Sequence, residues 1–133
     1  MAWLLDTNTC SYALKRRPPR LAEKLSSKPV KEVMVSTITV YELLTGCEKS
    51  PARQRLLREV NAFLAPFEKL VFNLEDSQKA AQVRASLESK GTPIGPYDVL
   101  LAAQALSRGL TLVTSNLREF RRVGGLDLED WTA

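Results

Sequence analysis

Short apolar runs alternate with helix-forming segments along the chain, and this alternation limits the folds that the chain can adopt. The patterns of buried strands occur at residues 2–5, 32–36, 69–73 and 110–113, and a short edge strand is expected at 126–129. Helices are predicted over residues 11–15, 19–26, 37–47, 51–65, 76–90, 96–108 and 117–120. Such alternation predicts an α/β fold, a three-layer sandwich around a mostly parallel sheet. Because no repeat or linker interrupts it, we expect residues 1–133 to form a single domain.

The segment from Gly95 to Leu106 predicts a buried helix with a carboxylate at its start. Pro96 suits the first helical position, where a missing N–H is not costly. Asp98 then falls in the first turn, and only Gln104 is polar among the next eight residues, so the helix should pack on several sides. Two roles are open for Asp98: it caps the helix and complements its dipole, or it binds a metal.

Histidine is absent from the chain, and the only cysteines are Cys10 and Cys47. This composition excludes Ser-His-Asp and Cys-His nucleophile systems, histidine-dependent ribonuclease chemistry, and zinc sites that need histidine or four cysteines. The two cysteines lack CxxC spacing, and we expect them to be reduced, partly buried thiols. The chemistry that remains available is a set of carboxylates with an oxygen-preferring metal, or a Lys, Tyr or Ser system.

The chain is basic, with 19 Lys and Arg residues against 15 Asp and Glu residues. This charge fits either an ordinary solvated surface or a surface that contacts a phosphate-rich partner. No apolar run approaches the ~18–20 residues of a membrane span, and Trp3-Leu4-Leu5 leads straight into Asp6 without a signal-peptide pattern. The sequence therefore predicts a cytoplasmic protein without membrane contact.

Acidic residues occur where the predicted parallel strands end. Asp6 directly follows strand 2–5, Glu42 lies in the helix after strand 32–36, and Asp98 begins the helix that leads into strand 110–113. Glu119 lies just beyond strand 110–113. The carboxyl ends of parallel strands share one edge of a sheet, where ligands bind in such folds, so these acids can converge there.

Each acid also has a structural explanation when it is taken alone. Asp6 could cap the helix that follows it, and Glu42 fits a capping-box spacing with Thr39. Their joint placement is harder to explain in this way, because clustered carboxylates repel and raise one another's pKa unless a cation binds. Donors that are all oxygen favour Mg²⁺, with Mn²⁺ as the alternative. A carboxylate-bound metal on a basic protein suggests phosphodiester hydrolysis. In such a reaction one metal activates water, and a second, ~3.5–4 Å away, stabilises the leaving oxygen.

Four segments in order resemble the signature blocks of PIN-domain ribonucleases: residues 4–8 (LLDTN), 36–46 (STITVYELLTG), 91–98 (GTPIGPYD) and 112–120 (LVTSNLREF). Residues 123–131 (VGGLDLEDW) are similar to the C-terminus of VapC toxins from bacterial type II toxin–antitoxin systems. The resemblance covers nearly the whole chain. It implies a PIN-like fold with a five-stranded parallel sheet in the order 3-2-1-4-5. It also implies a Mg²⁺-dependent endoribonuclease that cleaves RNA, such as tRNA loops, with metal-activated water.

Carried onto this chain, the resemblance implies catalytic roles for four acids, with Asp6 and Asp98 as the metal ligands; the set is Asp6, Glu42, Asp98 and Glu119. Many PIN domains have an Asp after the fourth strand, where this chain has Thr-Ser-Asn at 114–116. Either Glu119 or Asn116 therefore completes the site, and we assign Glu119. The residues expected to orient carboxylates or water are Asn8, Thr114 and Asn116.

The resemblance also implies partners for the chain. A small VapB-like antitoxin would neutralise the toxin, the chain would form a homodimer and a hetero-oligomer with the antitoxin, and DNA would be contacted only through the antitoxin. Six apolar residues are candidates either for the core or for a groove that binds an amphipathic antitoxin helix: Tyr12, Leu21, Leu25, Leu43, Leu56 and Phe63. A basic antitoxin side chain could enter the acidic site and displace the metal.

Three alternative functions make different demands on the residues near Asp6 and after the fourth strand. A metal-dependent phosphatase of the haloacid-dehalogenase type would have a second Asp two residues after Asp6, where this chain has Asn8. A response-regulator receiver would have an acid beside Asp6 and a Lys after the fourth strand, and the chain has neither. A non-catalytic PIN-like protein that binds RNA or a partner stays open, because an intact motif does not measure turnover.

Overall fold

The computed structural model describes residues 2–133 and contains one parallel sheet. Its strands are β1 (Trp3–Leu5), β2 (Val33–Ser36), β3 (Glu68–Leu70), β4 (Thr111–Val113) and β5 (Leu128–Glu129). They lie in the order β3-β2-β1-β4-β5, and each neighbouring pair is parallel. The predicted α/β class and the order 3-2-1-4-5 are therefore confirmed, and the edge strand β5 is parallel as well.

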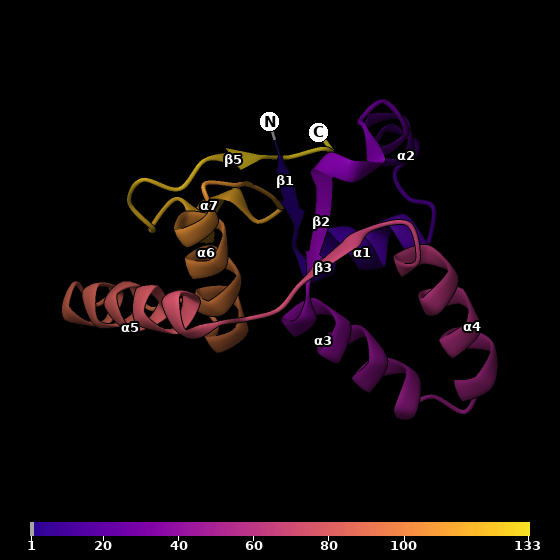
Figure 1. The fold of residues 1–133 in the computed structure, drawn as a ribbon, viewed down its shortest axis with the longest axis horizontal. Coiled ribbons are helices and arrows are strands. Elements are labelled where there is room, and N and C mark those ends of the chain that lie inside the picture. The colour runs from indigo at the N-terminus through magenta and orange to yellow at the C-terminus, as the bar shows by residue number, and fades with distance from the viewer. Residues whose placement is uncertain (1) are drawn as a thin grey trace.

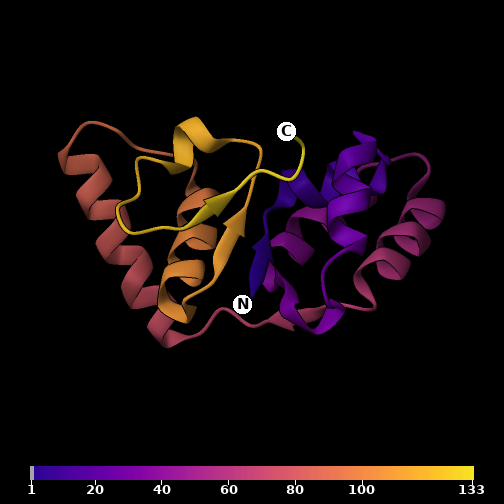
Figure 2. The ribbon, with the colours of Figure 1, turned by 90° about the horizontal axis from the view of Figure 1, so that it is seen from above.

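Helices cover both faces of this sheet. They are α1 (Thr7–Leu14), α2 (Pro19–Ser26), the 3₁₀ turn η1 (Val30–Glu32), α3 (Thr37–Glu48), α4 (Arg53–Leu64), α5 (Leu74–Ser89), α6 (Pro96–Arg108) and α7 (Leu117–Phe120). Figures 1 and 2 show α5 and α6 on one side of the strands and α1 to α4 on the other, so the molecule has three layers. None of the helices within residues 2–133 is both long and apolar enough to cross a membrane.

The apolar strand residues sort into two core clusters, one on each face of the sheet. Leu4 and Leu112 pack with the side chains of α5 and α6, whereas Trp3, Leu5 and Val113 pack with those of α1 to α4. Successive residues of a strand point to opposite faces, which explains the sorting. Because helices cover both faces of the sheet, the strand sequences are continuously apolar and do not alternate between apolar and polar residues.

Some element boundaries differ from the sequence expectation because local caps decide them. Helix α1 begins at Thr7 rather than at residue 11, since Asp6 is its N-cap. Helix α5 begins at Leu74 rather than at residue 76, because Asn73 and Asp76 form a capping box with 2.9 Å hydrogen bonds in both directions. Strand β3 covers Glu68–Leu70 rather than residues 69–73. Helix α4 and strand β5 each begin two residues later than expected.

The central helix α6 has the predicted bounds and the predicted burial. Leu101, Gln104 and the alanines between and beside them are inaccessible to solvent. The helix ends at Gly109, whose φ of 65° lies in the left-handed region. Its N–H bonds back to the carbonyl groups of the last turn, as in a glycine C-cap.

Two glycine substitutions should change stability in opposite directions. A Cβ at Gly109 or at Gly46, which lies within α3, would meet no atom within 4 Å, so the backbone conformation alone decides the outcome. We expect Gly109→Ala to destabilise the fold by about 1–2 kcal/mol, because an L-residue is strained at positive φ. Gly46→Ala should stabilise it by up to ~1 kcal/mol, since alanine favours a helix interior. Urea unfolding of both variants measures the difference, and shifts of the same sign would contradict this explanation.

Candidate active site

Four acids from four different elements meet at one edge of the sheet. Asp6 follows β1, Glu42 lies on α3, Asp98 lies in the first turn of α6, and Glu119 lies on α7. Asp98 is close enough to the other three to interact with their charges. The edge is the one where β1 and β2 end and α3 begins, at the lower side of Figure 1. The structure thus brings together the four acids that the sequence singled out.

Asp98 is the acid most strongly affected by this grouping. Burial raises its pKa to about 7, and the charge and hydrogen bond of Glu119 and the charges of Asp6 and Glu42 add to the rise. Asp98 does not cap its helix, because the N-cap is Gly95 and no side chain makes a capping hydrogen bond there. The capping role considered for Asp98 is therefore wrong, although a position in the first turn still suits the helix dipole.

Glu119 is held by two hydrogen bonds and pairs with Asp98. Its Oε1 accepts from the Gly95 backbone N–H at 2.9 Å, and its Oε2 accepts from Asn116 Nδ2 at 2.9 Å. The pKa of Glu119 lies below its ordinary value, and the hydrogen bond from Gly95 is the largest cause. A Cβ at Gly95 would lie 3.1 Å from Asp98 Oδ2, so a glycine lets the backbone approach the pair. The metal-free site therefore favours a protonated Asp98 beside an ionised Glu119.

Asp6 is nearly inaccessible to solvent, with 3% of its surface exposed. Its Oδ1 accepts from the Thr9 backbone N–H at 2.8 Å, so the predicted cap on α1 is present. Burial raises the pKa of Asp6 despite opposing hydrogen bonds from Thr114 and Thr9. The Thr114 hydroxyl also accepts from the Asn116 backbone N–H at 3.0 Å. The cap fixes the direction of the Asp6 carboxylate, so capping and ligand binding are compatible roles.

Glu42 is oriented by a residue that the sequence analysis did not single out. Thr7 Oγ1 donates to Glu42 Oε1 at 2.7 Å and lies 3.0 Å from Thr39 Oγ1. The capping-box interpretation of Glu42 is wrong, because the N-cap of α3 is Ser36. Asn8, one residue further along α1, is exposed. Sequence spacing could not reveal the Thr7 contact, which joins two helices far apart in the chain.

The two cysteines are core residues rather than members of the acidic set. Cys10 and Cys47 are buried free thiols in the core cluster beneath α1 to α4. Burial raises the pKa of the Cys10 thiol well above its usual range. A thiol that resists ionisation is a poor nucleophile and metal ligand, so the chemistry rests with the carboxylates.

The acids fit a divalent cation by their chemistry, although their side chains are not closed around one. Within residues 2–133, no three Asp, Glu or Cys side chains are arranged closely enough to hold a metal ion as they stand. All the donors are carboxylate oxygens, the ligands that Mg²⁺ and Mn²⁺ prefer. Burial is the main reason for the raised pKa of Asp98, and the neighbouring carboxylates add a repulsion that a bound cation would relieve.

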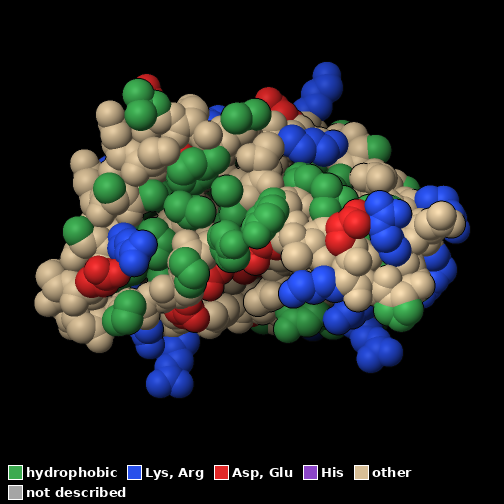
Figure 3. Space-filling view, turned by 90° about the horizontal axis from the view of Figure 1, so that it is seen from below, with side chains coloured by type: hydrophobic (Ala, Val, Ile, Leu, Met, Phe, Trp, Pro, Cys, Tyr) green, Lys and Arg blue, Asp and Glu red, His purple; other side chains and the backbone are tan. Residues whose placement is uncertain are grey.

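Basic residues surround this acidic centre. Figure 3 shows acidic side chains near the middle of the lower face, beside a cluster of hydrophobic side chains, with Lys and Arg side chains mostly toward the edges. On and after α7, Arg118, Arg121 and Arg122 are exposed close to Glu119 in the chain. The charge of Arg122 helps to lower the pKa of Glu119, after the larger effect of the Gly95 hydrogen bond.

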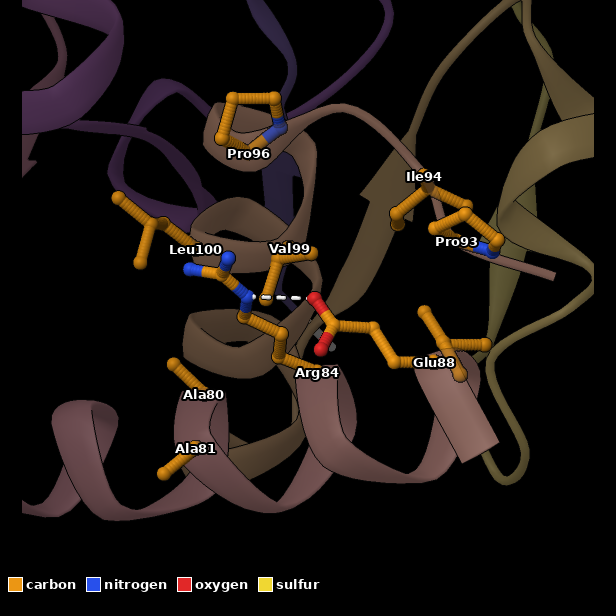
Figure 4. A pocket seen from close by; sticks show the side chains of 10 residues that line it. Ala80, Ala81, Arg84, Glu88, Pro93, Ile94, Pro96, Val99 and Leu100 are labelled. Atoms are coloured by element: carbon orange, nitrogen blue, oxygen red, sulfur yellow. Dashed lines mark hydrogen bonds and ion pairs between the residues drawn. The ribbon is translucent and has the colours of Figure 1, made fainter. Parts of the chain in front are cut away.

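A separate apolar groove of about 520 Å³ lies between α5 and α6. Figure 4 shows its lining, with alanines and the Arg84–Glu88 pair of α5 facing the prolines and apolar side chains at the start of α6. Arg84 Nε donates to Glu88 Oε2 at 2.8 Å across one turn. None of the four acids lines this groove, so it is distinct from the acidic site.

The sequence and the fold of the chain are matched by known proteins. The family model described as PIN domain matches residues 3–126. The chain belongs to the PIN domain family. This PIN domain is similar to two proteins named tRNA(fMet)-specific endonuclease VapC. The one from Salmonella typhimurium is 42% identical over 131 residues and 98% of both chains, and the one from Shigella flexneri is 38% identical over 132 residues and 99% of both.

A solved structure agrees with the sequence relatives. The crystal structure of DNA-bound VapBC from Salmonella typhimurium contains a chain 42% identical to this PIN domain, with a TM-score of 0.93 and 98% of each chain covered. The predicted membership among PIN-domain ribonucleases of the VapC type is confirmed by these matches.

Proposed function

We propose that residues 1–133 act as one PIN-like domain, the toxin of a type II toxin–antitoxin system and a divalent-metal-dependent endoribonuclease. The observation that carries this proposal is the convergence of Asp6, Glu42 and Glu119 around Asp98 at the carboxyl edge of the parallel sheet. The VapC relatives from Salmonella typhimurium and Shigella flexneri are named as tRNA(fMet)-specific endonucleases, which supports RNA as the substrate. We propose tRNA loops as the substrate class.

We assign the roles within the site as follows. Asp6 and Asp98 would hold Mg²⁺, or Mn²⁺ in its place, with Glu42 and Glu119 completing the acidic set. When bound, the cation supplies positive charge that offsets the carboxylate repulsion and the charge that develops on a phosphodiester. Thr7 fixes Glu42, and Asn116 with the Gly95 N–H fixes Glu119, so that both carboxylates keep one orientation.

The surroundings of the site suit RNA whose backbone is accessible. Arg118, Arg121 and Arg122 are exposed and can contact phosphates with salt-dependent affinity. Glu42, Asp98 and Glu119 are partly accessible at this edge, and none of the four acids lines the grooves that flank α3 and α6. A single-stranded or loop segment can present a splayed phosphodiester to such an edge, whereas a regular duplex cannot.

We further propose a VapB-like antitoxin as the partner, within a hetero-oligomer that contains a toxin homodimer and contacts DNA through the antitoxin. The solved relative from Salmonella typhimurium is a DNA-bound VapBC complex, which supports this partner. Among the six apolar candidates for its groove, two are core residues and four are at least partly accessible: Leu21 and Leu43 are buried, Leu25, Leu56 and Phe63 are half-buried, and Tyr12 is exposed.

Removing divalent cations should abolish the proposed activity. We expect EDTA to lower cleavage of a tRNA substrate at least ~100-fold, because the acids then repel both one another and the phosphate. Added Mg²⁺ or Mn²⁺ should restore cleavage, and it should raise the melting temperature of the wild type. A gel assay with labelled tRNA measures the first effect, and a thermal-shift assay measures the second.

The outcomes of this experiment separate the alternatives. Full cleavage in EDTA would overturn the metal-dependent proposal. Metal binding without RNA cleavage would favour the non-catalytic PIN-like protein, and hydrolysis of p-nitrophenyl phosphate alone would favour the phosphatase. Sequencing of RNA ends after expression of the protein, compared with its Asp6→Ala variant, then identifies the target and the cleavage position.

A further inference from the structure

Two tyrosines stand at the edge of the acidic site, and the proposed chemistry does not use them. Tyr41 directly precedes Glu42 on α3, and Tyr97 directly precedes Asp98 on α6. Their hydroxyl oxygens lie 3.2 Å apart, and their rings meet edge to face with centroids 5.7 Å apart and an interplanar angle of 60°. The pair therefore bridges the two helices that carry two of the four acids.

This tyrosine pair is exposed even though its rings are large and partly apolar. Tyr41 is 53% exposed and Tyr97 is 40% exposed. The Tyr41 hydrogen bond raises the pKa of Tyr97, and the nearby charge of Glu42 adds to the rise, so the pair lies next to the acids in space as well as in sequence. The hydroxyl contact fixes the rings in one arrangement, and a fixed exposed ring loses little entropy when it binds a flat ligand.

An open hollow of about 530 Å³ continues from Tyr41 along the side of α3. Val40 and Leu44 line it together with Thr37 and Thr45, and Lys49 lies at its far end beside Glu48, whose carboxylate accepts from Arg53 Nε at 2.7 Å. An aromatic ring beside hydroxyl groups and a lysine is the combination with which proteins bind single-stranded nucleic acid: bases stack on the rings and phosphates contact the cation. Figure 3 shows hydrophobic side chains beside the acidic ones at the middle of this face.

We propose that the tyrosine pair is a stacking platform for the RNA base next to the phosphodiester that is cut. This inference rests on the proposed endoribonuclease function and adds to it the way in which the nucleotide is held. Stacking on an aromatic face is tolerant of sequence, because every base has such a face. The platform thus holds an unpaired nucleotide in place and excludes a base-paired one, whose faces are already stacked.

The test compares leucine with phenylalanine at both positions. Tyr41→Leu and Tyr97→Leu keep apolar bulk but remove the ring, and each should raise the KM for a short single-stranded oligoribonucleotide about tenfold, with a much smaller change in kcat. Tyr41→Phe and Tyr97→Phe restore the ring and should recover most of that loss. Val30→Ala is the control, because Val30 is an exposed apolar residue before β2, at the opposite edge of the sheet.

A second measurement does not depend on cleavage. At protein concentrations high enough to saturate the weaker metal-free binding in EDTA, a 2-aminopurine base in the oligoribonucleotide should be quenched by the wild type and the Phe variants, and much less by the Leu variants. Unchanged KM and quenching in the Leu variants would overturn the platform while leaving the nuclease function intact. Loss of antitoxin binding in these variants, without any change toward RNA, would likewise overturn it and make the pair a protein contact. If no cleavage is found at all, ring-dependent quenching still supports the platform.

Discussion

The Asp98→Asn variant should lose RNA cleavage by at least ~1,000-fold and should at the same time be more stable than the wild type without metal. Activity is lost because a neutral amide cannot offer a cation the charge of a carboxylate. Stability is gained because burial and the charges of Glu119, Asp6 and Glu42 raise the pKa of Asp98 to about 7. The asparagine copies the protonated acid, since it is neutral and its amide can donate to Glu119.

The gain in stability should depend on pH in a defined direction. The Asp98 carboxyl has an ordinary pKa of 3.8 and a folded pKa of about 7, so the metal-free folded state binds the proton more tightly than the unfolded chain. The contribution of Asp98 to the free energy of unfolding of the wild type therefore falls as the pH rises from about 4 to about 7. Above that range we expect the asparagine variant to be more stable by about 1–2 kcal/mol, less than the full shift implies because solvent screens a half-buried carboxylate.

Urea unfolding in EDTA at several pH values measures this effect, and the tRNA assay measures the loss of cleavage. Asp127→Asn is the matched control, because Asp127 is an exposed Asp outside the acidic edge and should change neither quantity. Mg²⁺ should stabilise the wild type but not Asp98→Asn. Cleavage at the wild-type rate in Asp98→Asn would make the assignment of Asp98 wrong, and a variant less stable at neutral pH would contradict the electrostatic explanation.

The Arg108→Ala variant should lose about 2–4 kcal/mol of stability without any change at the acidic edge. Arg108 Nη2 lies 3.1 Å from Oδ2 of Asp76, which is completely buried, and it also donates to the Val71 carbonyl at 2.7 Å. Ser107 and Gln104 of α6 also donate to Asp76. Burial opposes ionisation of Asp76, but the hydrogen bonds from Arg108, Ser107 and the Asn73 backbone hold its pKa below the ordinary value. Without the guanidinium, a buried carboxylate loses its counter-charge.

Arg84→Ala is the matched control for this second variant. Arg84 pairs with Glu88 on the exposed surface of α5, where solvent and salt screen the ion pair, so its loss should hardly change the free energy of unfolding. The lowered pKa of Asp76 means that its pairing stabilises the fold above about pH 4 and that this stability is lost as the pH falls through the folded pKa. The difference in free energy of unfolding between the wild type and Arg108→Ala should therefore become smaller at acidic pH. Equal losses in Arg84→Ala and Arg108→Ala would contradict the buried-pair explanation.

Local patterns in the sequence were sufficient to predict the helices and strands and the edge of the sheet at which the acids lie. The apolar strands, the buried helix from Pro96 to Arg108 and the acids after the strand ends all depend on residues close together in the chain. The resemblance to PIN domains added the strand order, and the structure confirms it. The absence of histidine limited the chemistry to oxygen donors before any fold was known. The roles of the four acids and of their polar neighbours stay predictions until the variants are measured.

Tertiary structure alone decided which side chains meet. Three hydrogen bonds join residues that are far apart in the sequence: Thr7 and Glu42 are separated by 35 positions, Gly95 and Glu119 by 24, and Tyr41 and Tyr97 by 56. The prediction that Asp6 caps a helix is correct. The capping roles considered for Asp98 and Glu42 are wrong, because Gly95 and Ser36 are the N-caps of their helices. The physical reason is that periodicity and caps act within a few residues of the chain. The direction in which a side chain points across a helix interface depends instead on how the helices pack on the sheet.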